Sequence, residues 1–173
     1  MQYAHKIGDH VMYLNNGVCK IVDIREEQFI AGMPKTYFVL SPLIDERSEI
    51  YVPVDSEGLT ANIFELLTEK EIKAAIKDSE KSVCEWIPDV KERSAEFTKI
   101  ISGGNRAAIL SVIKTLSDYR AELESRKKKF YASDERIFNA ANKFITEEFA
   151  FVLGIPHDEV KSYIIENMQN DAS

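Results

Sequence analysis

The segment Lys6–Ile24 reads KIGDHVMYLNNGVCKIVDI and decides the fold expected for the first part of the chain. Strand-forming residues lie on both sides of the tripeptide Asn15-Asn16-Gly17. Because Asn and Gly tolerate positive φ angles, this tripeptide predicts a tight turn between two antiparallel strands. Gly8-Asp9 is a second turn signal, and it places the first strand close to the N-terminus.

The pattern of short strands and turns continues to residue 54. Strand-forming residues are dense in Thr36–Leu40. The segment Ser48–Val54 has the alternating pattern of a strand as far as Pro53. Gly32-Met33-Pro34 predicts another turn. Four or five short strands within roughly 50 residues imply a strongly bent sheet or a small barrel, because a flat hairpin of this size is not stable alone.

Helical patterns follow Asp55. Thr68 and Glu71 have the spacing of a capping box, which predicts a helix through about Lys77. Longer helices are expected over residues 86–101, from residue 106 to at most 129, from 133 to Gly154, and from Pro156 onward. Residues 60–67 fit either a short helix or a strand. The predicted fold class is therefore α+β, with a β domain of residues 1–67 and an all-α helical bundle of residues 68–173.

One apolar face is expected for the longest helix of the bundle. Apolar residues recur with the three- and four-residue spacing that places them on one side of a helix. The residues expected to face the core are Ile109, Val112, Ile113, Leu116 and Leu123.

Composition narrows the possible settings of the protein. The chain has 173 residues, of which 45% are hydrophobic, and this is enough for real cores. No apolar run is long enough to span a bilayer, and residues 1–9 lack the apolar core of a signal peptide. Cys19 and Cys84 are far apart in sequence, so a disulfide framework is not expected and a reducing cytoplasm is predicted.

Charge is distributed unevenly along the chain, whose net charge is −7. Residues 1–67 carry 5 Lys/Arg and 10 Asp/Glu, residues 86–143 carry 12 and 8, and residues 144–173 carry 1 and 6. The overall acidity argues against a protein that coats nucleic acid non-specifically, whereas the basic middle segment leaves room for a local cationic face.

The N-terminal pattern resembles a known domain. The spacing G-D-x-V-x-Y-x-x-x-G-V-x-x-I from Gly8 to Ile21, followed by Val52-Pro53-Val54, is similar to the RNA-polymerase-interacting domain of CarD-like bacterial transcription regulators. Transcription-repair coupling factors share this domain. The resemblance implies a small Tudor-like (SH3-like) β-barrel that binds the β subunit of RNA polymerase.

The helical half also resembles CarD-like proteins, in which the C-terminal domain touches promoter DNA. The matching pieces are Trp86, the Ser102-Gly103 break, the apolar stripe 109–116, the helix start 132–136 and the segment 147–150. In the family, basic residues follow the tryptophan directly, whereas here Ile87-Pro88-Asp89 follows. Nearly the whole chain is covered by the resemblance.

The resemblance implies a set of DNA-contacting residues. Trp86 would be an aromatic wedge in the minor groove at the upstream edge of the open bubble, because an apolar ring can fill the gap left by an unstacked base step. Packing inside the bundle is the alternative for this residue. Phosphate contacts are expected from Lys91, Arg93 and Arg136, and the run Arg126–Lys129 either joins them or is simply a solvated helix end.

The polymerase-contacting surface is expected on the strand that ends in Val52-Pro53. An exposed strand edge can extend the sheet of a partner through main-chain hydrogen bonds. The candidate contact residues are Arg25, Lys35, Tyr37, Glu49 and Tyr51. Family members often carry a basic residue where Tyr51 stands, and an ordinary barrel position is the alternative for this tyrosine.

We expect no catalytic residues, no metal site and no cofactor. His5, His10 and His157 lack cysteine or carboxylate partners at ligand spacing, and no phosphate-binding loop or nucleophile elbow is present. Two functions remain. One is a regulator that holds the polymerase β subunit and stabilises open complexes through weak, largely sequence-independent contacts with promoter DNA. The other is an adaptor that binds the polymerase or another protein without touching DNA.

Overall fold

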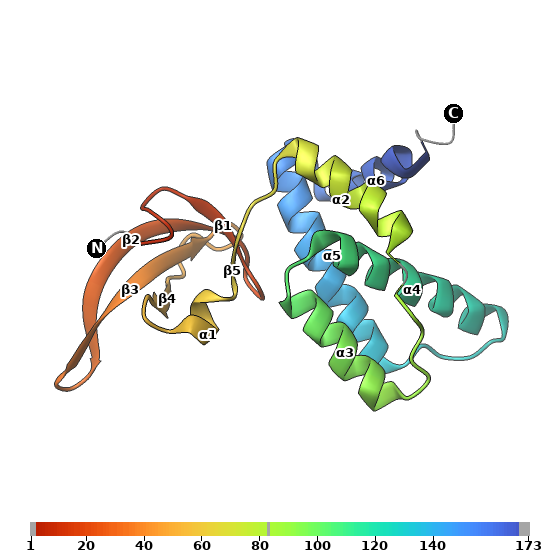
Figure 1. Cartoon of the computed structure of the whole chain (residues 1–173), viewed down its shortest axis with the longest axis horizontal. Coiled ribbons are helices and arrows are strands. Elements are labelled where there is room, and N and C mark those ends of the chain that lie inside the picture. Colours follow the sequence, from red (N-terminus) through yellow and green to blue (C-terminus); the bar gives the residue numbers. More distant parts are fainter. Residues whose placement is uncertain (1–2, 83, 170–173) are drawn as a thin grey trace. The chain divides into compact units, whose positions relative to one another are not determined.

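The computed structural model describes residues 3–82 and 84–169. The chain divides into two compact units, Met1–Leu66 and Leu67–Ser173, which we call the β unit and the helical unit (Figure 1). The α+β class predicted from the sequence is confirmed.

The β unit is one antiparallel sheet with the strand order β4-β3-β2-β1-β5. A single-turn helix, α1 (Glu57–Thr60), connects the last two strands along the chain. The strands are β1 (His10–Tyr13), β2 (Gly17–Ile30), β3 (Met33–Pro42), β4 (Ile50–Pro53) and β5 (Ile63–Glu65). Residues 60–67, for which the sequence allowed a helix or a strand, contain the end of α1 and all of β5.

The first hairpin has the predicted turn. Gly17 has a φ of 74°, which a residue without a Cβ adopts without strain. The N–H of Asn16 donates to the carbonyl of Tyr13 at 2.8 Å. The register then pairs Val11 with Cys19 and Met12 with Val18.

The second hairpin is longer than expected. β2 has 14 residues and β3 has 10, and both strands curve together as far as the turn (Figure 1). The turn lies at Ala31-Gly32, where Gly32 has a φ of 76°, and Met33-Pro34 already belongs to β3. A register shift between Ile21 and Asp23 marks an irregularity in the ladder, a feature that bends a strand and increases its twist.

The sheet is open. β4 and β5 are its two edges, and the described strand pairs do not include one between them, so the closed Tudor-like barrel is not confirmed. One face of the sheet carries the apolar core of the unit, which consists of Val11, Cys19, Ile21, Phe38, Leu40, Val52 and Ile63. Met12, Val18 and Val39, which lie on the opposite face of the same strands, are also buried. The open sheet therefore has buried apolar residues on both faces.

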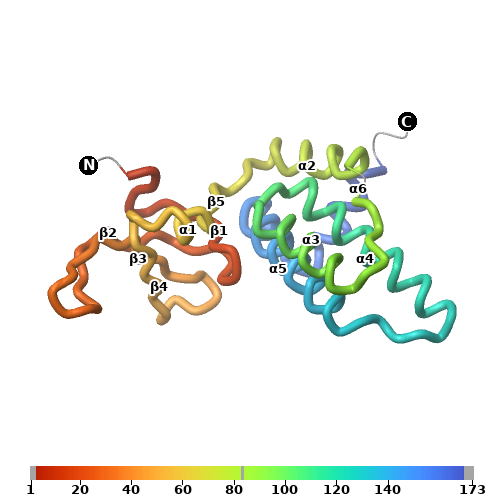
Figure 2. Tube along the Cα trace, turned by 60° about the horizontal axis from the view of Figure 1, so that its bottom comes forward, coloured from red at the N-terminus to blue at the C-terminus, as the bar shows by residue number. Residues whose placement is uncertain are grey.

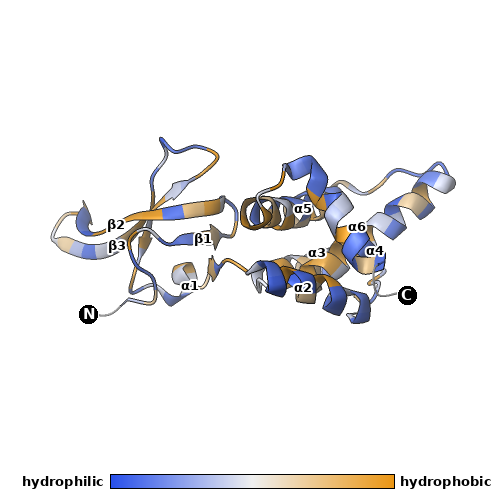
Figure 3. Ribbon diagram, turned by 90° about the horizontal axis from the view of Figure 1, so that it is seen from above, coloured by the Kyte–Doolittle hydropathy of each residue, from blue (hydrophilic) through white to orange (hydrophobic). Residues whose placement is uncertain are grey.

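The helical unit packs four long helices and a short C-terminal one. They are α2 (Glu69–Lys81), α3 (Val90–Ser102), α4 (Arg106–Ser125), α5 (Ala132–Leu153) and α6 (Val160–Gln169), with the 3-10 turn η1 (His157–Glu159) before α6. α3, α4 and α5 contact one another, and α2 contacts α4, α5 and α6 (Figure 2). Hydrophobic residues alternate with hydrophilic ones along these helices, as expected for elements that bury one face (Figure 3).

Most helix ends match their sequence signals. The Thr68 hydroxyl accepts from the N–H of Glu71, and the Glu71 carboxylate accepts from the N–H of Thr68, which confirms the capping box. Gly154 ends α5 with a φ of 65°. Three boundaries differ: α2 continues to Lys81 rather than Lys77, α3 begins at Val90 rather than at residue 86, and Pro156 precedes the 3-10 turn rather than opening the last helix. α4 ends at Ser125, within the expected limit of residue 129.

The core of the helical unit includes most of the predicted face of α4. Ile109, Val112 and Leu116 are fully buried and Leu123 is nearly so. Ile113 is only half-buried, because it faces an open groove of about 590 Å³ between α4, α5 and α6.

Candidate functional site

The edge strand β4 exposes main-chain groups at Tyr51. Opposed residues in an antiparallel pair alternate between hydrogen-bonded and non-hydrogen-bonded pairs. The N–H of Val54 donates to the carbonyl of Thr36 at 3.0 Å, so the pair Phe38–Val52, two residues along, is also hydrogen-bonded. The pair Val39–Tyr51 between them is not, and the N–H and C=O of Tyr51 therefore point away from β3, towards the free edge.

The neighbours of Tyr51 along this edge are limited. Pro53 has no N–H, and its carbonyl accepts from the N–H of Ser56 at 3.2 Å. Tyr51 thus presents the one complete donor–acceptor pair on the outer side of residues 51–53. This is the arrangement that a partner strand extends.

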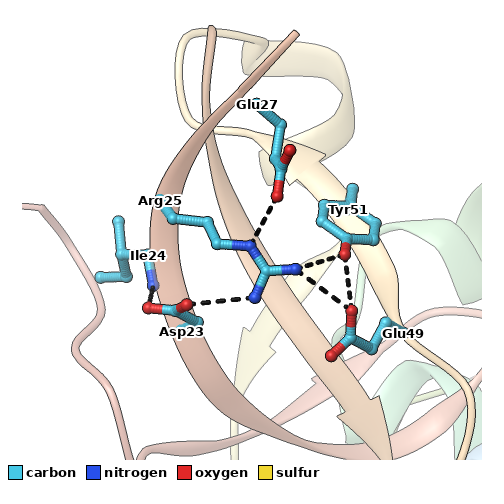
Figure 4. A network of polar contacts seen from close by, with 6 residues as sticks. All are labelled: Asp23, Ile24, Arg25, Glu27, Glu49 and Tyr51. Carbon is cyan, nitrogen blue, oxygen red and sulfur yellow. Dashed lines mark hydrogen bonds and ion pairs between the residues drawn. The ribbon is translucent and has the colours of Figure 1, made fainter. Parts of the chain in front are cut away.

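The side chain of Arg25 contacts four side chains, those of Asp23, Glu27, Glu49 and Tyr51 (Figure 4). Its Nε donates to Glu27 at 2.7 Å, one terminal nitrogen donates to Asp23 at 3.1 Å, and the other donates to Glu49 at 3.3 Å and to the Tyr51 hydroxyl. These side chains are between one-third and one-half exposed.

Both ends of this network have shifted acidities. Hydrogen bonds to Glu27 and Asp23 raise the pKa of Arg25 still further above its usual value, and the hydrogen bond to Glu49 raises the pKa of Tyr51. Arg25 therefore remains a cation, and Tyr51 remains a protonated phenol that donates to Glu49.

Three aromatic rings lie beside the Arg25 network. Phe29, Tyr37 and Tyr51 meet edge-to-face, with ring centroids 5.2 Å apart for Phe29–Tyr37 and 5.0 Å for Phe29–Tyr51. Phe29 is 61% exposed although it belongs to this cluster. An exposed aromatic surface next to a free strand edge is typical of a protein-binding site.

The five polymerase-contact residues predicted from the sequence lie together on this face. Arg25, Tyr37, Glu49 and Tyr51 belong to the clusters just described, and Lys35 lies across from Glu27 and pairs with Asp55 at 3.6 Å. Arg25 is already bound to groups of its own chain. The sequence prediction missed Asp23, Glu27 and Phe29. They share a face with Arg25 because β2 continues to Ile30 and side chains on one face recur every second residue.

Trp86 lies in the extended segment between α2 and α3. It is half-buried, and its ring stacks on Tyr119 with centroids 3.9 Å apart and an interplanar angle of 37°. The guanidinium of Arg93 covers the indole at 4.1 Å from its centroid. Ser111 fixes the segment from α4, because its hydroxyl accepts from the N–H of Cys84 and donates to the carbonyl of Ser82.

Arg93 is a core residue, although the sequence placed it among the DNA-contacting cations. Its side chain is 1% exposed and forms two hydrogen bonds to Asp134, at 3.0 and 2.7 Å. It also donates to the carbonyls of Ile87 and Pro88. The charge of Arg93 is therefore paired within the chain. The bonds to Asp134 join α3 to α5, and the bonds to the two carbonyls hold the Trp86 segment in place.

Lys91 and Arg136 are exposed. Lys91 is the second residue of α3 and Arg136 the fifth residue of α5, and the Arg93–Asp134 pair joins the N-terminal ends of these two helices. Two helix N-termini and two exposed cations thus accompany Trp86 at one end of the helical unit, a combination that favours anions.

A second buried ion pair lies at the opposite end of α5. Arg106 binds Glu148 through two hydrogen bonds of 2.9 and 2.8 Å, and Glu148 also accepts from the N–H of Leu67 at 3.0 Å. Asp134 and Glu148 are fully buried, and each has an arginine partner.

The basic run Arg126–Lys129 forms the end of α4. Lys127 has a φ of 54°, and the N–H groups of Lys127 and Lys128 donate to the carbonyls of Glu124 and Leu123. This is a Schellman motif with a lysine in the position that glycine usually occupies. At least part of the run therefore serves to terminate the helix, while all four side chains remain exposed.

Within residues 3–82 and 84–169, no group of three His, Cys, Asp or Glu side chains is arranged to hold a metal ion. No helix in these same ranges is long and apolar enough to cross a membrane.

The family comparison matches the β unit. The family model of the CarD-like/TRCF RID domain matches residues 5–63. The N-terminal unit is a CarD-like/TRCF RID domain. The match extends from before β1 to the first residue of β5, so it includes β4 and the whole face around Arg25.

The helical unit lies outside this match. Its resemblance to CarD-like proteins therefore still depends on the residues quoted above, from Trp86 to the segment 147–150. A search of curated proteins found no match to the chain.

Proposed function

We propose that the chain is a non-catalytic transcription regulator whose RID domain binds the β subunit of RNA polymerase through the edge of β4. The observation that carries this proposal is the free N–H and C=O of Tyr51 on an edge strand of a domain from a polymerase-interacting family. A strand from the polymerase would pair with β4, and main-chain hydrogen bonds would supply affinity that does not depend on side-chain identity.

A comparison of two substitutions at Tyr51 tests strand addition. Tyr51→Ala removes the phenol only, whereas Tyr51→Pro also removes the N–H, which the ladder with β3 does not use. Proline is tolerated at such positions of edge strands. We expect the proline variant to bind the isolated β subunit about tenfold more weakly than the alanine variant, as for the loss of one main-chain hydrogen bond. Equal affinity of the two variants would contradict docking along this edge.

We also propose that the helical unit contacts promoter DNA near the upstream edge of the open bubble. The supporting observation is Trp86, which contacts both Arg93 and Tyr119 at the end of the unit where Lys91 and Arg136 are exposed. A wedge gains binding energy only when a base step is unstacked, and a ligand shifts an equilibrium only through such differential binding. The indole would therefore lengthen the lifetime of open complexes.

Trp86→Ala and Tyr119→Ala are the matched variants for this second proposal. Both disturb the stack, but only the first removes the ring that would meet DNA. Trp86→Ala should shorten the open-complex lifetime by a factor that corresponds to a loss of roughly 1–3 kcal/mol in binding free energy, as for one aromatic–base stack. Tyr119→Ala should lower the melting temperature with a smaller effect on that lifetime.

Equal effects of the two variants would favour the adaptor that binds protein only. The burial of Arg93 gives this alternative some weight, because it removes one of the three predicted phosphate contacts. Neutralising Lys91 and Arg136 together also distinguishes DNA contact from protein-only binding. If these residues contact phosphates, the open-complex lifetime becomes shorter and less dependent on salt.

A further inference from the structure

The outer face of β2, β3 and β4 combines exposed aromatic rings with carboxylates. We call it the acidic aromatic face and define it by Glu27, Phe29, Tyr37, Glu49 and Tyr51. It adjoins the free edge at Tyr51, so a strand paired with β4 would place every second side chain next to it. Phe29 is 61% exposed, and the carboxylates of Glu27 and Glu49 are 35% and 45% exposed.

The charge of this face is negative. Four carboxylates, those of Asp23, Glu27, Glu49 and Asp55, surround only two cations, Arg25 and Lys35. Both cations are bound to these same carboxylates. The face therefore has an excess of two negative charges and has no cation that is not already paired with its own chain.

We propose that the polymerase segment that docks along β4 presents lysine or arginine side chains to the acidic aromatic face. This inference rests on the proposed function and adds the chemistry of the partner surface. Tyr51 adds no charge to this face, so the carboxylates of Glu27 and Glu49 determine its sign. Complementary charges at such an interface select the partner and accelerate association.

Arg25 illustrates how the face accommodates a guanidinium. It lies 5.3 Å from the centroid of the Tyr51 ring and donates to Glu27 and Glu49 (Figure 4). A cation over an aromatic ring with a carboxylate at its rim gains both cation–π and ion-pair energy. The exposed ring of Phe29 offers a second surface of the same kind to a cation from outside.

Lys35 and Glu27 provide a test with opposite signs. They lie directly opposite each other in the β2–β3 register. In the full chain, Glu27→Gln should weaken binding to the isolated polymerase β subunit about threefold, and Glu27→Gln with Glu49→Gln roughly tenfold. Lys35→Gln should strengthen it by up to about threefold. All these differences should shrink as NaCl is raised from roughly 50 to 300 mM, because salt screens exposed charges.

Glu26→Gln is the matched control. Glu26 is exposed and adjoins Glu27 on β2, so its side chain points to the other face of the strand. This variant should bind like the unchanged chain, and thermal melts of all variants should coincide. Three results would overturn this inference without affecting the proposed function, provided that the unchanged chain binds. They are tighter binding by Glu27→Gln, weaker binding by Lys35→Gln, and no effect of either substitution. Absence of binding by the unchanged chain would contradict the proposed function as well.

Discussion

Two arginine–carboxylate pairs are almost entirely removed from water within the helical unit. The side chains of Arg93 and Asp134 are 1% and 0% exposed, and those of Arg106 and Glu148 are 9% and 0% exposed. Such pairs survive burial only when further hydrogen bonds satisfy their remaining groups. The carbonyls of residues 87 and 88 do this for the first pair, and the carbonyl of Gly104 and the N–H of Leu67 do so for the second.

The Arg93–Asp134 pair gives the first prediction. Asp134→Ala leaves a buried guanidinium without its counter-charge, so it should destabilise the helical unit by about 3–5 kcal/mol. Arg93→Met combined with Asp134→Leu should recover much of this loss, because it removes both charges and keeps the volume. Urea unfolding of the unchanged chain and of these two variants measures the effect. A loss below about 1 kcal/mol in Asp134→Ala would mean that water reaches the pair.

The sequence contained a signal that these charged residues are buried, but no signal for which residue pairs with which. Arg93 is followed by Phe97 and Ile101 at four-residue intervals, so it lies on the buried stripe of α3. Asp134 and Glu148 lie likewise on the buried stripe of α5. A charge on an apolar stripe indicates a buried pair, yet the partner of Arg93 is 41 residues away and no local pattern identifies it.

Among the elements, the second hairpin differs most from its prediction. Residues 26–28 are polar and have low strand propensity, so the sequence alone does not indicate that β2 continues to Ile30. Pairing with β3 decides the outcome, because Glu26 and Glu27 lie opposite Thr36 and Lys35 in the ladder. The first hairpin was predictable because Asn16-Gly17 specifies its turn locally.

Helix α4 gives a prediction that separates its buried face from its groove side. Leu116→Asp would bury an unpaired carboxylate among fully buried side chains and should unfold the helical unit. Ile113→Asp places the same carboxylate at the half-buried groove, where water can solvate it, and should cost roughly 1–2 kcal/mol. Circular dichroism melts distinguish the two. Equal melting temperatures for these variants would show that Ile113 is as buried as Leu116.

The whole chain consists of two units with separate cores, and this gives a prediction of independent folding. Residues 1–67 contain all five strands and the apolar cluster of the sheet. We expect this fragment to fold and to bind the β subunit with the affinity of the full chain. Dispersed amide signals in an NMR spectrum and a binding titration check both parts. An unfolded fragment would show that the sheet needs the helices for stability.

The sequence of the helical unit did not determine which of its cations lie on the surface. Lys91 and Arg136 are exposed and accompany Trp86 at one end of the unit, whereas Arg93 is inside it. Thr68 and Gly154 marked the start of α2 and the end of α5 locally, but the choice between a surface and a buried arginine depends on packing across α3 and α5. The strand β4 was easier to predict, because the Val52-Pro53 strand end is part of a recognisable domain pattern.

Hydrogen–deuterium exchange of the full chain, with and without RNA polymerase, tests the docking of β4 most directly. If a polymerase strand pairs with β4, the amide of Tyr51 becomes a hydrogen-bond donor and exchange slows in peptides that cover residues 48–54. Exchange in α3, α4 and α5 should stay unchanged when no DNA is present. Protection of the helices without any protection of residues 48–54 would contradict docking through β4.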